Sequence, residues 1–272
     1  MRQPAVTFAA LEGWTRFVHA EQVWGTVVTF DVRGPEEIAE SRSFASAAGA
    51  VVQEAVTFLH DVDSWFSTYR VDTPITALRN GLLELEDMPS VVHSVLDACR
   101  RARWLTRGVF DPWAVPGGVD PSGYVKGWAA DVAADLVVGR GFANVSVNAA
   151  GDVSCRGYQS PGRPWVVGIR HPDHADQIVR SVVALDEAVA TSGCYERGEH
   201  IVDPRAGSFS ATLDSATVVG PDGGMADALA TALVIAGAEG ASWFAQLPGW
   251  SAYLVDGAEA TFFGPAFTSI RN

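Results

Sequence analysis

Hydrophobic and polar residues repeat along this chain with two periods, one typical of helices and one typical of strands. From Gly34 to about Asp61 the apolar side chains recur at helical spacing, which predicts a helix with one buried stripe. The stripe consists of Ile38, Phe44, Ala48, Val51, Val52, Ala55, Val56 and Leu59. A second helix is predicted from Met88-Pro89 to about Thr106, with Gly108 at its end.

Strands are predicted in two parts of the chain. Residues 23–32 are rich in β-branched residues and predict a strand that forms one half of a hairpin. Between 143 and 185, short β runs at 143–148, 153–158, 165–170 and 178–185 alternate with Gly and Pro turns. A helix follows Gly220-Pro221, then a helical stretch at 241–247 and a hairpin from 251–255 and 261–263. The pattern has no repeat or linker, and it predicts an α+β fold in one compact domain over residues 1–272.

Candidate chemistry is concentrated between residues 188 and 207. A short run of alanine and β-branched residues is expected to turn at Ser192-Gly193, and six polar side chains follow within eleven residues: Tyr195, Glu196, Arg197, His200, Asp203 and Arg205. Loops on a rigid scaffold often present reactive groups. His200 titrates near neutral pH, and Asp203 is close enough in sequence to orient it. An exposed loop with a hydrogen-bonded histidine is the alternative interpretation.

A second candidate site lies on the helix after Gly220. Asp227 and Thr231 are four residues apart, so both side chains project from one helix face. A carboxylate and a hydroxyl suit a hard cation such as Mg²⁺. Alternatively, Asp227 stabilises the start of the helix and Thr231 bonds back to its own helix.

Composition narrows the possible partners and compartments. The net charge of −13 and the absence of a dense Lys/Arg run outside 100–103 argue against a nucleic-acid partner. An acidic protein that binds an anionic ligand must neutralise it locally, through a metal, backbone N–H groups or placed cations. No stretch approaches ~18 consecutive apolar residues, so no membrane span is expected. The first residues show no secretory leader and no cysteine to acylate, which favours a cytoplasmic location or a leader already removed.

The three cysteines provide neither a zinc signature nor a disulfide framework, because their spacings are wide. Cys194 lies inside the polar stretch, which raises the hypothesis of a thiol hydrolase. A small residue at a tight turn is the favoured interpretation of Cys194.

Six blocks in the same order resemble the FAD:protein FMN transferase (ApbE) family. They are Trp24-Gly25-Thr26, W-F-S-T-Y-R-V-D-T-P-I-T-A-L-R-N (65–80), G-V-F-D-P (108–112), D-P-S-G-Y-V-K-G-W-A-A-D (120–131), N-A-A-G-D-V (148–153), and T-S-G-C-Y-E-R with H-I-V-D-P-R-A-G and A-D-A-L-A-T-A-L (191–233). Trp24 stands where the family has Met, and Pro74 where it often has Glu. Only seven residues, 113–119, occupy the place of a longer family insertion.

The resemblance implies an α+β domain with mixed or antiparallel sheets, flanking helices and an FAD site in a central cleft. It implies FAD contacts from Trp24, Tyr69, Val109, Phe110, Asp111, Asp120, Lys126 and Ile201. It also implies a Mg²⁺ ion held by the Gly123 carbonyl, Asp227 and Thr231. Lys126, near the expected start of a helix at 128–138, is a plausible phosphate partner. On its residue type alone, it would be read as a solvated surface lysine.

The reaction that the resemblance implies is cleavage of the FAD pyrophosphate by a Thr or Ser hydroxyl of a target flavoprotein. FMN becomes attached to the target and AMP leaves. His200 is the expected general base, with Asp203 as the alternative. Two other functions use the same motifs: a Mg²⁺-dependent FAD pyrophosphatase with water as nucleophile, and a non-catalytic FAD-binding protein.

Overall fold

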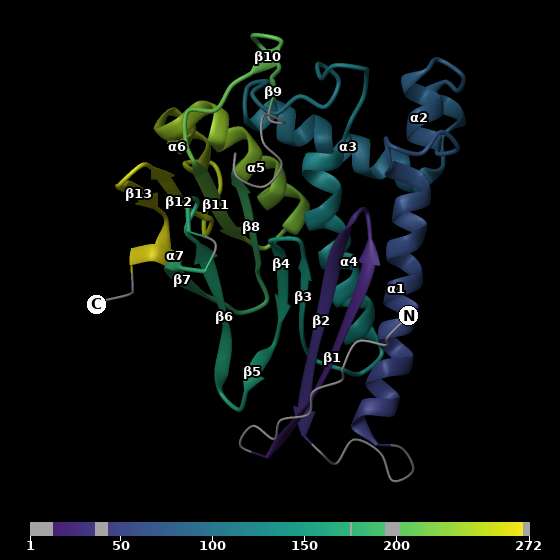
Figure 1. Cartoon of the computed structure of the whole chain (residues 1–272), viewed down its shortest axis with the longest axis vertical. Coiled ribbons are helices and arrows are strands. Elements are labelled where there is room, and N and C mark those ends of the chain that lie inside the picture. The colour runs from purple at the N-terminus through teal and green to yellow at the C-terminus, as the bar shows by residue number, and fades with distance from the viewer. Residues whose placement is uncertain (1–12, 36–42, 175, 194–201, 269–272) are drawn as a thin grey trace.

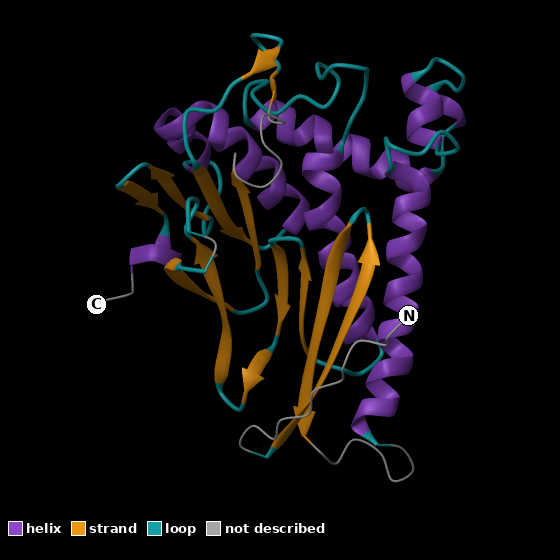
Figure 2. Cartoon of the chain, viewed as in Figure 1, coloured by secondary structure: helices purple, strands orange, loops and turns teal. Residues whose placement is uncertain are grey.

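The fold is a layer of helices packed on one face of an eight-stranded antiparallel sheet (Figures 1 and 2). The structure is a computed structural model that describes residues 13–35, 43–174, 176–193 and 202–268. In spatial order the strands of the sheet are β1 (Trp14–Val23), β2 (Thr26–Pro35), β3 (Asn144–Ala149), β4 (Asp152–Arg156), β8 (Ala188–Gly193), β11 (Ser215–Gly220), β12 (Ser251–Asp256) and β13 (Glu259–Phe263).

Two smaller sheets accompany the large one. The strands β5 (Tyr158–Ser160), β6 (Arg163–Arg170) and β7 (Ile178–Ala184) form a three-stranded sheet, and β9 (Val202–Asp203) pairs with β10 (Ser208–Phe209). A second, smaller apolar cluster joins the three-stranded sheet to the large one through Trp165, Ile169, Val189 and Tyr253.

The main helices are α1 (Phe44–Phe66), α3 (Ser90–Leu105), α4 (Ser122–Gly139) and α5 (Gly223–Ala236). Shorter pieces are α2 (Pro74–Arg79), α6 (Ala241–Phe244), α7 (Pro265–Thr268) and the 3₁₀ turns η1 (Leu85–Asp87) and η2 (Gly237–Gly240). The long helix α1 buries most of the stripe predicted from its sequence, against β1 and α4; Val51 is half-buried, and Ile38 lies outside the described residues.

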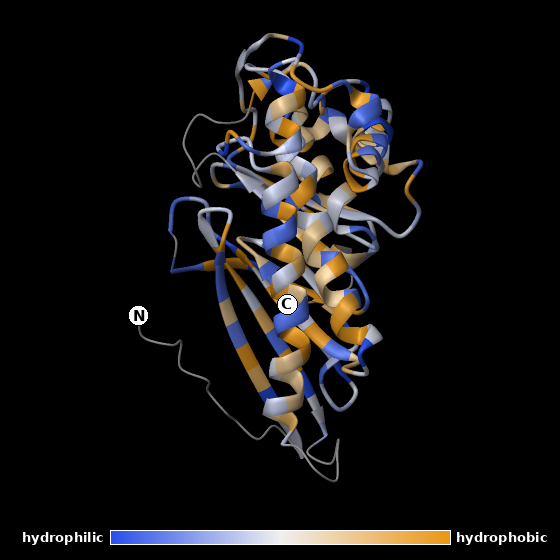
Figure 3. Cartoon of the chain, turned by 90° about the vertical axis from the view of Figure 1, so that its right-hand side faces the viewer, coloured by the Kyte–Doolittle hydropathy of each residue, from blue (hydrophilic) through white to orange (hydrophobic). Residues whose placement is uncertain are grey.

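The β1–β2 hairpin alternates between polar and apolar residues along its length (Figure 3). Val28, Phe30 and Val32 face the core and are fully buried, so the residues between them form the opposite, polar face. The hairpin turns on Trp24 and Gly25, whose φ angles of 58° and 71° are the left-handed pair that a two-residue turn of the favoured twist requires.

Helices α4 and α5 approach each other more closely than side chains would allow. A Cβ placed on Gly127 would lie 2.0 Å from the carbonyl oxygen of Gly223, so only glycine fits at this crossing. The neighbouring core positions of α4 are alanines, namely Ala129, Ala130, Ala133 and Ala134. The small residues therefore set the distance between the two helices.

The stretch Gly223–Phe244, which begins with α5, is long and apolar enough to cross a membrane by length and composition. However, 67% of its most apolar window is buried inside the protein, as expected of a core helix. Almost every residue of α5 is buried, because the helix packs between β8, β11 and α4.

Most of the predicted elements are confirmed, including both hairpins, the helix that begins after Pro89 and the strands between 143 and 185. The predicted start of the strand at 23–32 is wrong, because Val23 ends β1, Trp24 and Gly25 form the turn, and β2 begins at Thr26. The predicted start of the first helix is wrong: Gly34 and Pro35 end β2, and Ser43 caps α1 at Phe44. That the whole of residues 1–272 forms one domain stays a prediction.

Three further boundaries need correction. The fourth helix begins at Ser122 instead of 128, which places Lys126 in its second turn. The 65–80 block is expected from its sequence to be a loop after the first helix, but it contains α2, because the Thr73 hydroxyl accepts a hydrogen bond from the Thr76 N–H and Pro74 suits a first helical position. Ser192 and Gly193 pair with β11 as part of β8 and do not form a turn.

Replacing Gly127 with Ala should destabilise the protein by roughly 3 kcal/mol, because the new methyl group forces α4 and α5 apart. Gly139→Ala in the same helix is the matched control: a Cβ at that position meets nothing within 4 Å, so stability should stay or rise by up to about 1 kcal/mol. Denaturant unfolding gives the free energy of unfolding of both variants. Equal effects of the two substitutions would show that the helix crossing tolerates a side chain.

Candidate functional site

The centre of the candidate site is an ion-pair cluster around Lys126 of α4. Its ammonium lies 2.7 Å from Asp152 Oδ2 at the start of β4 and 3.0 Å from Asp227 Oδ2 on α5. The side chain of Lys126 is 25% exposed, whereas those of Asp152 and Asp227 are 4% and 2% exposed. The Lys126 ammonium therefore contacts two buried carboxylates, while part of its own side chain stays accessible to solvent.

The pKa of Lys126 reflects this position. Burial lowers its pKa, but attraction and hydrogen bonding from Asp152 and Asp227 outweigh burial and hold it above the ordinary value. The ammonium therefore stays charged at any working pH. Lys126 is also the single lysine among 19 basic residues, all the others being arginine. A compact ammonium can be shared between two close carboxylates, which a broad, planar guanidinium fits less well.

The oxygens proposed as metal ligands lie together in the structure. Asp227 and Thr231 are one turn apart on α5, and a Cβ built on Gly123 would lie 3.3 Å from Thr231 Oγ1. The Gly127 N–H, whose regular helical acceptor is the Gly123 carbonyl, also donates to Asp227 Oδ2 at 3.4 Å. This places the Gly123 carbonyl next to the Asp227 carboxylate.

These residues fit a hard divalent cation. A carboxylate, a hydroxyl and a backbone carbonyl form an all-oxygen set of the kind Mg²⁺ prefers, with room for phosphate and water ligands. The Lys126 ammonium already shows that a positive charge is stabilised beside Asp227. Among the described residues, no group of three His, Cys, Asp or Glu side chains could hold a metal by itself. A metal here therefore depends on the hydroxyl and carbonyl ligands.

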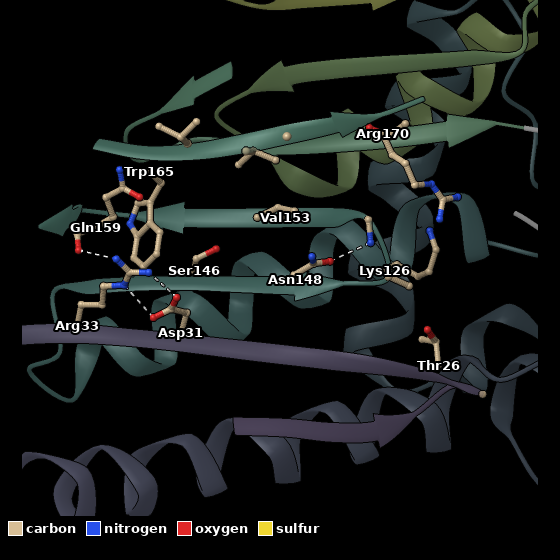
Figure 4. Close-up of a pocket in the computed structure, with 17 residues that line it drawn as sticks. Thr26, Asp31, Arg33, Lys126, Ser146, Asn148, Val153, Gln159, Trp165 and Arg170 are labelled. Carbon is tan, nitrogen blue, oxygen red and sulfur yellow. Dashed lines mark hydrogen bonds and ion pairs between the residues drawn. The ribbon is translucent and has the colours of Figure 1, made fainter. Parts of the chain in front are cut away.

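Lys126 opens into a cavity of about 930 Å³ that is lined mainly by polar residues. Thr26 of the hairpin, Thr191 of β8 and Arg170 of β6 also line it. Figure 4 shows Arg170 and Lys126 at the same end of the cavity, with their cationic groups pointing toward each other. This end combines two cations with buried carboxylates and hydroxyls, which is a suitable environment for a phosphate group next to a metal.

Trp24, from which the resemblance implies an FAD contact, lies beside this cavity. It lines a neighbouring cavity of about 430 Å³, which shares Gly25 and Thr26 with the larger one. Its indole Nε1 is buried, and within the described residues the structure gives this donor no hydrogen-bond partner. A buried donor without a partner is costly, so a ligand acceptor at this place would be stabilising.

Of the two candidate bases, Asp203 is described, whereas His200 lies outside the described residues, as does Ile201, an expected FAD contact. Asp203 accepts two hydrogen bonds from the Arg205 guanidinium, at 2.9 and 2.8 Å, and one from the Arg205 backbone N–H. The bond from the Arg205 side chain is the main reason why the pKa of Asp203 lies below its ordinary value. A carboxylate held in this way is a weak base and a good anchor for its turn.

The remaining predicted FAD contacts lie in different surroundings. Tyr69 is 89% exposed and lines neither of the two cavities. Val109 and Phe110 are buried, and the ring of Phe110 lies against Gly123, so ligand contacts from these two residues would come from their backbone. Asp111 pairs with Arg103, and Asp120 accepts from the Ser122 N–H at the start of α4.

The cysteines that the structure describes do not suit thiol chemistry. Cys99 and Cys155 are free and buried, and burial raises the pKa of Cys155 to about 12. Neither forms a reactive thiolate near neutral pH. Cys194 lies outside the described residues.

Sequence reasoning assigned no role to three residues of this site. Asp152 completes the Lys126 cluster, Ser192 Oγ lies 3.1 Å from Thr231 Oγ1, and Arg170 lines the cavity. The single lysine was an available signal, because a chain that otherwise uses arginine retains an ammonium at this position. No sequence pattern pairs Lys126 with Asp227, which is 101 residues away.

The fold is that of solved flavin transferases. A structure described as "Flavin Transferase ApbE from Vibrio cholerae" superposes with a TM-score of 0.78 at 21% identity, over 93% of this chain and 98% of that one. The apo form of the Pseudomonas stutzeri flavinyl transferase ApbE gives 0.76 at 21% identity, over 95% and 98%. At this identity the likeness establishes the shared architecture.

Sequence comparison identifies the family. The ApbE family model matches residues 114–254, just over half of the chain, and the protein belongs to the ApbE family. FAD:protein FMN transferases of Vibrio cholerae and Escherichia coli K12 are 34% and 31% identical over 131 and 164 residues. These matches cover 44% and 56% of this chain, and they span only 39% and 47% of the relatives' own lengths.

Replacing Lys126 with Met should lower the free energy of unfolding by about 3–5 kcal/mol at neutral pH, because two buried carboxylates then lose their cation. Arg101→Met on the exposed surface of α3 is the control and should change stability by less than about 0.5 kcal/mol. Thermal and denaturant unfolding give the stability of both variants. If Lys126→Met loses no more stability than the control, the ion-pair cluster does not stabilise the fold.

Proposed function

We propose that this protein is a Mg²⁺-dependent FAD:protein FMN transferase, which moves FMN from FAD to a Thr or Ser hydroxyl of a target flavoprotein. The observation that best supports this function is the meeting of Gly123, Asp227 and Thr231 beside Lys126, which itself lines one end of a polar cavity. The names of the relatives in its family agree with it.

In the proposed reaction the target hydroxyl oxygen attacks the flavin-side phosphorus of FAD. A new phosphorus–oxygen bond forms, the bond to the bridging pyrophosphate oxygen breaks, and AMP leaves with that oxygen. Catalysis of phosphoryl transfer is mostly positioning and neutralisation of charge. Lys126 and Arg170 face the cavity where the pyrophosphate would lie and would offset its negative charge.

Gly123, Asp227 and Thr231 would hold the metal ion. When bound, Mg²⁺ supplies Lewis-acid stabilisation of the charge that develops on the phosphate oxygens. Asp227 keeps its position through Lys126 and the Gly127 N–H, and Thr231 keeps its position through the Ser192 hydroxyl. The ligand set is thus oriented by its neighbours without the metal.

His200 is the proposed general base that accepts the proton of the incoming hydroxyl, since imidazole titrates near working pH. Asp203 is the less suitable candidate, because Arg205 occupies its oxygens and lowers its pKa. In this proposal Asp203 and Arg205 hold the turn that follows His200 in the chain.

The first test is to incubate the protein with FAD, Mg²⁺ and a flavoprotein acceptor, and to follow the acceptor mass. The acceptor should gain one FMN and AMP should be released. Asp227→Asn should reduce the rate by roughly 10²–10³-fold, as expected when a group that stabilises transition-state charge is lost. Asp61→Asn, at an exposed position of α1, is the matched control and should leave the rate unchanged.

The products distinguish the alternatives. Free FMN and AMP with an unmodified acceptor would indicate an FAD pyrophosphatase. FAD that binds and is not cleaved would indicate a flavin-binding protein.

The pH dependence of the transfer rate tests the base. The rate should rise with pH through about 6.5, as the imidazole of His200 loses its proton. Asp203, with its lowered pKa, is already ionised in this range and adds no such rise. In His200→Ala the transfer rate should fall about 10²–10⁴-fold and should no longer increase with pH in this range. In Asp203→Asn the rate should still increase with pH. An unchanged pH profile in His200→Ala would exclude histidine as the base.

A further inference from the structure

The cavity extends well beyond the end at which the proposed chemistry takes place. Lys126, Thr26 and Arg170 lie at one end, and Asp31, Arg33, Gln159 and Trp165 lie at the other, with Ser146 and Asn148 between them (Figure 4). The cations proposed for the pyrophosphate, Lys126 and Arg170, line the first end, and Asp227 contacts Lys126 there. The second end has no role in the proposed function.

The floor of this groove is the polar face of two paired strands. Asp31 and Arg33 of β2 and Ser146 and Asn148 of β3 occupy alternate positions, and Asp31 lies directly opposite Ser146. The helices cover the other face of these strands. One wall is β6, which lines the cavity with Trp165, Val166, Val167, Gly168 and Arg170. The groove therefore follows the strands and is open to an elongated ligand.

The length of the groove suits a peptide segment. From Thr26 to Arg33 the floor strand advances seven residues, which at ~3.4 Å per residue is roughly 24 Å. An extended chain of about the same number of residues has the same length. Partly exposed polar groups from both floor strands would give hydrogen-bond partners to its backbone, and Val166, which is 53% exposed, offers an apolar contact on the wall.

The charge of the groove differs between its two ends. At the far end Asp31 accepts hydrogen bonds from both Arg16 and Arg33, so one carboxylate faces two guanidiniums and the cluster has a net charge of +1. At the near end Lys126, Arg170, Asp152 and Asp227 together have a net charge of zero. In a protein with a net charge of −13, the positive far end would attract an acidic side chain.

The far cluster is a fixed part of the groove. Arg33 donates to the Gln159 carbonyl at 2.9 Å, and its guanidinium stacks 4.9 Å from the centre of the Trp165 ring. Burial raises the pKa of Asp31, but hydrogen bonds and attraction from Arg33 and Arg16 outweigh it and keep the pKa below its ordinary value. The positive charge is thus held in place across the physiological pH range.

We propose that this groove binds the target flavoprotein, as an inference that rests on the transferase function proposed above. An extended segment of the acceptor lies along β2, β3 and β6, with its Thr or Ser hydroxyl at the Lys126 end. An acidic side chain of the same segment, about five to seven residues from the hydroxyl, lies near Arg16 and Arg33. FAD occupies the Lys126 end and leaves the far end to the acceptor.

The test compares two substitutions at paired positions. Val166→Trp fills the groove wall, whereas Val183→Trp places the same side chain on the directly opposite residue of β7, one strand farther from the floor. Val183 is 49% exposed and does not line the cavity, so it is a close match for Val166. For each protein, transfer kinetics give the KM for the acceptor, and flavin fluorescence gives the affinity for FAD.

Val166→Trp should raise the KM for the acceptor by at least about tenfold, which is ~1.4 kcal/mol, and leave FAD affinity unchanged. Val183→Trp should match the unsubstituted protein in both measurements. Val166→Glu, a smaller change that adds a negative charge, should also raise the KM, and this increase should shrink at high salt. Melting temperatures of all variants confirm that each is folded.

Three outcomes would contradict the groove assignment in different ways. A parallel loss of FAD affinity in Val166→Trp would show that the dinucleotide fills the far end. Unchanged kinetics in both Val166 variants would show that the acceptor binds elsewhere. If the unsubstituted protein transfers no FMN, the proposed function itself fails, and the groove assignment fails with it.

Discussion

The close approach of α4 and α5 at Gly127 and Gly223 is the constraint on which the candidate site depends. Because no side chain separates the two helices at this crossing, the first turns of α4 come within hydrogen-bonding distance of Asp227 on α5. The same approach places Lys126 against both Asp227 and Asp152, and Gly123 against Thr231. A wider helix spacing would leave each of these polar groups buried without its partner, which is unfavourable in a core.

The sequence was informative where the signal is local. The spacing of Asp227 and Thr231 predicted a shared helix face, and apolar periodicity predicted the helices and both hairpins, because these features depend on neighbours a few residues apart. The predicted start of α4 was wrong because a side chain bonds the backbone there: Asp120 accepts a hydrogen bond from the Ser122 N–H, where α4 begins. The pairing of Lys126 with Asp152 and Asp227 depends on tertiary contacts, and the far end of the groove depends on strand pairing, so neither follows from a local pattern.

The distribution of charge separates this cavity from the rest of the surface. The chain is acidic overall, yet the lining of the cavity contains Arg33, Lys126 and Arg170 and a single acidic residue, Asp31. Arg33 is paired with Asp31 of its own strand, and Lys126 is paired with the buried Asp152 and Asp227, so the fold fixes both of these cations. Local positive charge in an acidic protein favours anionic ligands at this place and disfavours them elsewhere.

The burial of α5 has a consequence for the thermodynamics of ligand binding. Asp227 is 1% exposed and lies on a helix enclosed by β8, β11 and α4, so its backbone and side chain lose their conformational freedom when the protein folds. A cation that binds there orders little more of the chain, and its affinity is not reduced by an entropy cost of arranging ligands. Selectivity among cations should then follow from the fixed geometry of the oxygens, because a rigid ligand set cannot expand or contract to suit an ion of another size.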